Sequence, residues 1–139
     1  MEVKDLIEIL EKSENFFEQY NGTTKWSDGW KASIQGHSLE DIAVIYPKLL
    51  PLLIVSKASF KFGTQKLIDL GQNHEQSTKL LTIYIPNGID PKSYCELVKL
   101  NLDGYSGASD IPEKKSYTKY ADGIFYRNDR DASGEYIPA

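Results

Sequence analysis

The sequence contains a single cysteine, Cys95, and only two histidines, His37 and His74. One cysteine cannot form an intramolecular disulfide or a cysteine-rich metal site, so Cys95 is expected in the hydrophobic core. Two histidines are too few for an ordinary histidine-based zinc centre. We therefore expect that the protein binds no metal.

Long hydrophobic runs are also missing. The longest apolar stretch, Leu49 to Val55, is interrupted by Pro51 and is far too short to span a membrane. Acidic residues interrupt the apolar N-terminal segment, which excludes a signal peptide. We expect a cytoplasmic protein that does not act at a membrane. The alternative is a secreted or phage-encoded effector that is exported without a leader.

Arginine is scarce: the positive charge comes from fourteen lysines and only two arginines, Arg127 and Arg130. The net charge of -4 and the pI near 5.2 argue against a nucleic-acid-binding protein, which is usually basic. The motifs GxGxxG, Walker A, HExxH and GxSxG are absent as well. We therefore expect no nucleic-acid partner and no cofactor.

The length of 139 residues and an apolar content of 40% fit one ordinary globular domain. Helical and alternating hydrophobic patterns follow one another without a repeat or a linker, which predicts a compact α+β fold with a mainly antiparallel sheet flanked by helices. Residues 1–25 are expected to form an N-terminal amphipathic helical segment, and residues 26–139 the rest of the domain. The predicted helices are 2–20, 38–53, 65–70 and 90–103, and the predicted strands are 30–36, 58–62, 80–85 and 123–127.

Prolines and turn-forming residues refine this pattern. Pro47 and Pro51 lie inside the second predicted helix, which should therefore be kinked or split. Residues 104–118 are rich in glycine, serine, proline and lysine and are expected to form a loop. Residues 131–134 are expected to form a turn.

Three lysines stand out because they lie on predicted strands beside large apolar residues: Lys31, Lys61 and Lys79. Burying an ammonium group without a partner is costly, so a cluster of such lysines requires an explanation. If they point into one cleft, they can bind a phosphate, and their repulsion lowers the pKa of one of them until it can serve as a general base. The competing interpretations are a solvated outer face of the sheet for Lys31 and protection of a strand edge for Lys79.

Several short segments occur in the order known from one enzyme family. They are Trp30-Lys31-Ala32-Ser33, Ser59-Phe60-Lys61-Phe62, residues 74–86 ending in Tyr84-Ile85-Pro86, Gly104-Tyr105, Ser109-Asp110 and Gly123-Ile124-Phe125-Tyr126-Arg127. In this order the sequence resembles the lyase domain of class III and class IV lanthipeptide synthetases, which is related to the phosphothreonine lyase effectors. The resemblance covers residues 26–139.

The resemblance implies a metal-free β-elimination of phosphate from phosphoserine or phosphothreonine. It assigns Lys31 and Lys61 to catalysis, with Lys31 as the base or its partner and Lys61 close to the phosphate. It assigns Lys79 and Arg127 to phosphate binding and Asp110 to orienting a basic group.

The sequence also departs from the family pattern. The histidine that the family places two residues after its first lysine is Ser33 here, and a serine hydroxyl is a poor general acid near neutral pH. The glycine-rich approach to Lys79 is replaced by residues 74–78, which include His74 and the acidic Glu75. His37 and His74 are the candidates for a substitute acid, and both are also explained as ordinary loop histidines.

Two functions follow from this pattern. The first is a lyase-like domain that recognises a phosphorylated peptide or a partner protein, with reduced or lost elimination activity. The alternative is an active phosphoserine/phosphothreonine lyase that forms dehydroamino acids. Because the sequence starts at Met1 with its own helix, we expect a complete small protein rather than a fragment of a synthetase.

Overall fold

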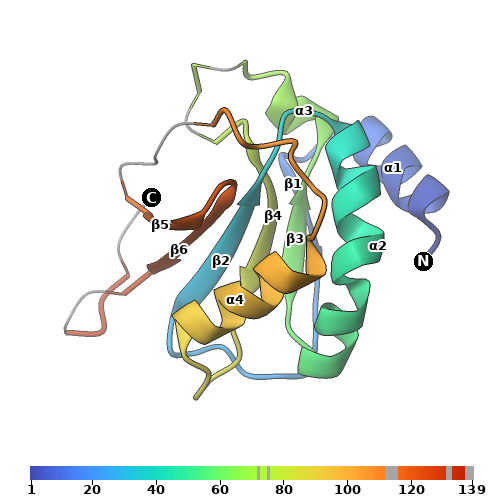
Figure 1. Ribbon diagram of the computed structural model, residues 1–139. Coiled ribbons are helices and arrows are strands. Elements are labelled where there is room, and N and C mark those ends of the chain that lie inside the picture. The colour runs from blue at the N-terminus through green and yellow to red at the C-terminus, as the bar shows by residue number, and fades with distance from the viewer. Residues whose placement is uncertain (72, 75, 112–115, 131–132, 137–139) are drawn as a thin grey trace.

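A six-stranded antiparallel sheet runs through the molecule in the order β1-β3-β4-β2-β6-β5 (Figure 1). The computed structural model describes residues 1–139 with the exception of 72, 75, 112–115, 131–132 and 137–139. Its elements are α1 (Val3–Lys12), β1 (Phe17–Tyr20), β2 (Trp30–Gln35), α2 (Leu39–Ser56), β3 (Phe60–Gly63), α3 (Gln65–Ile68), β4 (Lys79–Tyr84), α4 (Pro91–Asn101), β5 (Thr118–Ala121) and β6 (Ile124–Asn128).

The hydrophobic core lies between the sheet and the helices α1, α2 and α4. Alternate residues of the central strands, such as Ala32, Ile34 and Ile83, point into this core and are completely buried. Leu6 of α1 and Val98 of α4 are also fully buried and belong to the same core. The predicted α+β domain with an antiparallel sheet and flanking helices is therefore confirmed. Among the described helices, none is both long and apolar enough to cross a membrane.

The N-terminal helix is shorter than the sequence pattern predicted. Helix α1 ends at Lys12, and the last four residues of the predicted helix 2–20, Phe17–Tyr20, form strand β1 at the edge of the sheet. The cause is local: the Ser13 hydroxyl accepts a hydrogen bond from the Asn15 backbone N–H, which turns the chain. The Asn15 carbonyl then accepts a hydrogen bond from the Thr64 hydroxyl, and β1 pairs with β3. The helical prediction beyond residue 12 was wrong.

Helix α2 runs through both of its prolines without division. Pro47 and Pro51 lie on the exposed side of the helix, where water can satisfy carbonyl groups that lose their N–H donors. The opposite side carries the buried residues Ile42, Ile45 and Leu49, whose packing against the sheet keeps the helix in one piece. The predicted split of this helix is therefore not found.

Strand β5 has no counterpart in the sequence-based prediction. It pairs with β6 through a tight turn at Asp122-Gly123, where Gly123 adopts a positive φ of 74°. A side chain at position 123 would also place its Cβ 2.6 Å from that of Ala108, so glycine is required there. The expected loop precedes β5, but its residues 112–115 lie outside the described residues, as do 131 and 132 of the expected turn at 131–134.

Candidate functional site

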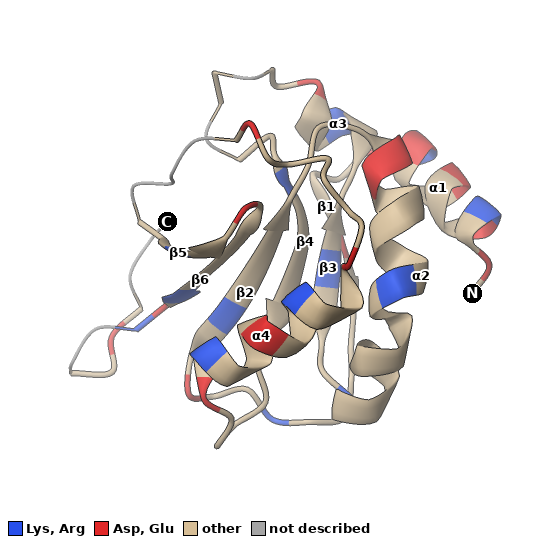
Figure 2. Ribbon diagram, viewed as in Figure 1, with Lys and Arg blue, Asp and Glu red and all other residues tan. Residues whose placement is uncertain are grey.

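The face of the sheet opposite the helices carries the lysines that the sequence singled out. Alternation along β2 places Lys31 on this face, and the register puts Arg127 of β6 directly beside it. Lys61 of β3 lies opposite Thr82 of β4 on the same face. An irregularity in the pairing of β2 with β4 sets Lys79 on this face as well. Figure 2 shows these basic positions as blue segments on neighbouring strands.

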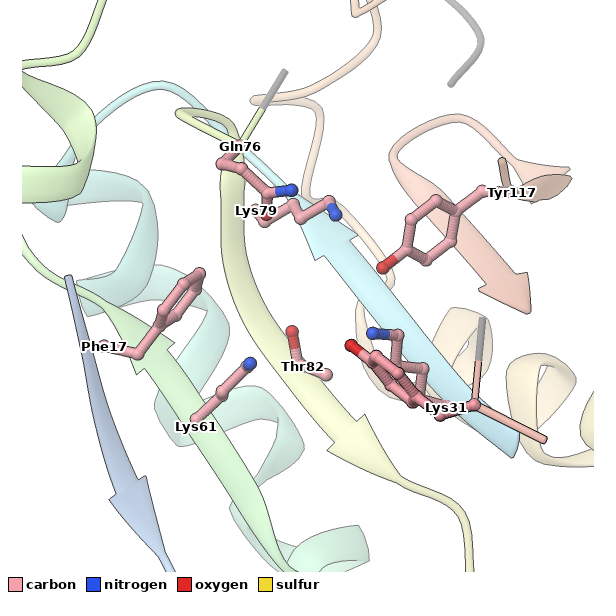
Figure 3. A pocket seen from close by; sticks show the side chains of 8 residues that line it. Phe17, Lys31, Lys61, Gln76, Lys79, Thr82 and Tyr117 are labelled. Atoms are coloured by element: carbon pink, nitrogen blue, oxygen red, sulfur yellow. The ribbon is translucent and has the colours of Figure 1, made fainter. Parts of the chain in front are cut away.

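The three lysines line one cavity of about 340 Å³. Lys31, Lys61 and Lys79 come from three adjacent strands, and Figure 3 shows their ammonium groups directed toward the same space. The other described residues of the lining are Phe17, Gln76, Thr82, Tyr117 and Tyr136. None of these described residues is acidic, so the cavity can accept an anion. The convergence that the sequence pattern required for a phosphate site is present.

Asp129 supplies the carboxylate at the edge of this cluster. Its Oδ1 lies 3.1 Å from Lys31 Nζ and 3.4 Å from Arg127 Nε. The side chains of Lys31, Arg127 and Asp129 are only 9%, 4% and 17% exposed. The competing interpretation of Lys31 as a solvated residue on the outer face of the sheet is therefore wrong. One carboxylate is thus shared between two buried cations.

Lys61 has the environment of a potential general base. Its ammonium group lies 4.3 Å from the centre of the Phe17 ring and 6.0 Å from that of Tyr84. Burial lowers the pKa of Lys61, and the positive charge of Lys31 lowers it further, whereas Asp129 acts in the opposite direction. The sequence predicted that mutual repulsion lowers the pKa of one lysine in the cluster, but for Lys61 burial is the larger cause and the charge of Lys31 the smaller one.

Tyr117 lies among the cations of the cluster, and no sequence pattern pointed to it. Its ring centre lies 4.6 Å from Lys79 Nζ, 5.8 Å from Lys31 Nζ and 5.7 Å from the guanidinium carbon of Arg127. The negative face of an aromatic ring attracts such cations and partly offsets their mutual repulsion. Burial raises the pKa of the Tyr117 hydroxyl, which therefore stays protonated at neutral pH. Only the folded chain brings this residue beside the strand lysines.

Ser33 lies beneath the cluster and does not line the cavity. It is fully buried, and its hydroxyl accepts a hydrogen bond of 2.6 Å from Gln35 Nε2. The other end of the Gln35 amide accepts a hydrogen bond of 2.8 Å from the Thr78 hydroxyl. Ser33 is thus held in a buried polar chain, and its position does not fit a proton donor to a molecule bound in the cavity.

The two histidines and Asp110 lie outside the cavity lining. His37 Nε2 pairs with Asp110 at 2.8 Å on the exposed surface. Asp110 thus contacts His37 and not a lysine of the cluster, and its implied role in orienting a basic group of the site stays a prediction. The exposed His74 accepts a hydrogen bond from the backbone N–H of Gln76. Glu75 lies outside the described residues, and the described part of the chain contains no group of metal-binding side chains.

A second cavity of about 310 Å³ continues the first one toward the start of β2. Lys31, Lys61 and Tyr136 line both cavities. The second cavity adds an aromatic wall, formed by Trp26 stacked on Tyr84 with ring centres 4.4 Å apart. The two spaces together form a groove with a cationic part and an aromatic part, and Asp129 lines the second of them.

Comparison with known proteins finds similarity at the level of structure. No protein-family model matches the chain, and no curated protein matches its sequence. OspF of Shigella flexneri, a type III effector and phosphothreonine lyase, is similar with a TM-score of 0.51 over 83% of this chain and 66% of OspF, at 16% identity. The Salmonella plasmid virulence C protein SpvC is similar with a TM-score of 0.53 over 88% of this chain and 65% of SpvC, at 15% identity.

A further phosphothreonine lyase structure gives a TM-score of 0.50 at 15% identity, over 84% of this chain and 62% of that one. The chain has the phosphothreonine lyase fold. It spans less than two thirds of the length of these three proteins. Within the phosphothreonine lyase fold, the lysine-lined cavity lies on the open face of the sheet, opposite the helices.

Proposed function

We propose that the cavity between Lys31, Lys61 and Lys79 binds the phosphate of a phosphorylated side chain in a peptide or partner protein. The observation that supports this proposal is the convergence of three ammonium groups from adjacent strands on a space whose described lining has no acidic residue. Charge-assisted hydrogen bonds to phosphate are stronger than those between neutral groups. A chain with a net charge of -4 that concentrates cations at one point can therefore select an anion there.

We further propose that elimination activity is reduced or lost relative to lyases that use a histidine acid. Ser33 occupies the position of that histidine in the resemblance, and it is buried and hydrogen-bonded to Gln35. Neither His37 nor His74 lines the cavity. A phosphate that leaves without receiving a proton is strongly basic, so the loss of this acid slows the reaction. The domain then acts mainly by recognition.

An active lyase is the second candidate, and the environment of Lys61 favours it. A general base must be neutral before it can remove a proton, and burial beside Lys31 lowers the pKa of Lys61 in this direction. Binding alone requires no such lowering. In this alternative, Lys61 removes the α-proton of phosphothreonine or phosphoserine while Lys31, Lys79 and Arg127 hold the phosphate.

The ordered motifs that surround Lys31 and Lys61 also support kinship with the lyase domains of lanthipeptide synthetases. The partner in that setting is a phosphorylated peptide. A comparison of binding to peptides and to folded phosphoproteins tests which partner the groove accepts.

The decisive experiment uses phosphothreonine peptides of varied sequence and their unphosphorylated counterparts. We expect the phosphorylated forms to bind at least about 100-fold more tightly, since charge-assisted contacts contribute roughly 1.5–3 kcal/mol each. Titration calorimetry measures the affinity, and mass spectrometry detects elimination as a loss of roughly 98 Da, the mass of phosphoric acid. Equal binding of both forms would contradict the proposed function. Binding without mass loss supports recognition, and binding with mass loss supports the lyase.

The pH dependence of any elimination reports on Lys61. We expect kcat/KM for elimination to rise with pH and to level off below pH 10.4, the ordinary pKa of lysine, because neutral Lys61 is the active form and its pKa is lowered in the free protein. A pH series of mass-loss rates between about pH 6 and 10 measures this profile. A rate that falls with rising pH across the range would rule out Lys61 as the base.

A further inference from the structure

The phosphate cavity contains few groups that can donate a proton besides its cations. Its described lining includes neither a histidine nor a carboxylic acid. Hydroxyl groups are present on Thr82, Tyr117 and Tyr136. Thr82 is buried in β4 and is, like Ser33, an alcohol of very low acidity, while Tyr136 is 64% exposed. Tyr117 remains, and Figure 3 shows its hydroxyl directed into the space between the lysines.

We propose that Tyr117 is the proton donor to the oxygen of the departing phosphate. This inference rests on the proposed phosphate site and concerns the elimination reaction at that site. It belongs to the second candidate function, the active lyase, in which Tyr117 supplies the proton that the lyase family takes from a histidine. The surroundings of Tyr117 fit this role, because Lys31, Lys79 and Arg127 lie around its ring.

The proposed step balances as follows. Neutral Lys61 takes the α-proton of the phosphorylated residue, and the electrons of that C–H bond form the Cα=Cβ double bond. The bond between Cβ and the phosphate oxygen breaks, and this oxygen takes the proton of the Tyr117 hydroxyl. The products are a dehydroamino acid and hydrogen phosphate. Water then carries a proton from the Lys61 ammonium to the tyrosinate, which restores both residues.

The acidity of a buried tyrosine suits this leaving group. A dianionic phosphate ester that departs without a proton forms a trianion, which is a strong base and takes a proton even from a weak acid. Burial keeps the Tyr117 hydroxyl protonated before the reaction, so the proton is available when the C–O bond breaks. The nearby positive charges of Lys31 and Lys79 stabilise the tyrosinate that forms.

The test compares Tyr117→Phe with the wild type on two peptides, one with phosphothreonine and one with the sulfate ester of threonine. Phenylalanine keeps the ring that contacts the three cations and removes only the hydroxyl. Sulfate leaves as a weakly basic dianion and needs no proton. We expect Y117F to eliminate phosphate at least about 100-fold more slowly than the wild type, while the sulfate rate changes less than about threefold. Calorimetry with both peptides should show affinities close to those of the wild type.

Each other outcome has a defined meaning. If Y117F slows both peptides equally, Tyr117 only supports the site and the inference is wrong. If the wild type binds the phosphopeptide without eliminating phosphate, the inference is wrong and the binding function stands. If the phosphopeptide does not bind, the proposed function itself fails. If Y117F does not fold, 3-fluorotyrosine can replace Tyr117 instead, because it keeps the shape of the side chain and has a more acidic hydroxyl. The elimination rate with the phosphothreonine peptide should then change, while the rate with the sulfate ester should not.

Discussion

Replacing Lys61 with alanine is expected to weaken phosphothreonine-peptide binding about 10- to 100-fold and to lower any elimination by at least about 100-fold. Lys61 lies on the central part of the open face, and its ammonium group points into the cavity. The change removes one charge-assisted contact to phosphate and the candidate base. Calorimetry and mass spectrometry measure the two effects on the same preparations.

Two further variants distinguish the positive charge of Lys61 from its ability to act as a base. Lys61→Arg keeps the positive charge but cannot lose its proton, so it should bind the phosphopeptide within about threefold of the wild type and show no elimination. Lys66→Ala is the matched control, because Lys66 also lies over an aromatic ring, that of Phe16 at 4.7 Å, but on the exposed surface. K66A should change neither the affinity for the phosphopeptide nor the elimination rate. Full elimination by K61R would contradict the assignment of Lys61 as the base.

The fold was predictable wherever a local pattern decides the structure. The alternation of Trp30, Ala32 and Ile34 predicted β2, because a strand with one buried face shows this period. Strand β5 (Thr118–Ala121) lacks such a pattern, since it lies at the sheet edge and is stabilised by its pairing with β6. Helix α1 was predicted too long because Phe16 and Phe17 continue the helical spacing, while hydrogen bonds to β3 and its flanking loop impose a strand.

The site was predictable in part for the same reason. Lys31 and Lys61 could be placed on one face from strand alternation and from the resemblance to the lyase domains. The roles of Tyr117 and Asp129 depend on contacts between segments that are far apart in the sequence. Tyr117 follows a loop without a structural pattern, and only pairing of β5 with β6 brings it over Arg127. Composition and spacing carry no signal for such a contact.

Asp129→Asn is expected to destabilise the unliganded protein by about 3–5 kcal/mol, because it removes the carboxylate that a buried Lys31 and a buried Arg127 share. Urea unfolding at neutral pH measures this loss. Asp122→Asn is the matched control, since Asp122 pairs with Lys119 at 3.1 Å on the surface, where such a pair contributes at most about 1 kcal/mol. A D129N protein as stable as D122N would show that the pair is not a buried one in solution.

The same substitution tests the anion site, because phosphate in the cavity can compensate for the missing carboxylate. In the wild type, Asp129 attracts the Lys31 ammonium and repels an incoming phosphate. In D129N this competition is gone, so a phosphopeptide should bind more tightly and should raise the unfolding temperature more than it does in the wild type. An equal rise in both proteins would mean that the anion binds away from Lys31. A larger rise in D129N would mean that Asp129 holds the cations together until a phosphate takes over that role.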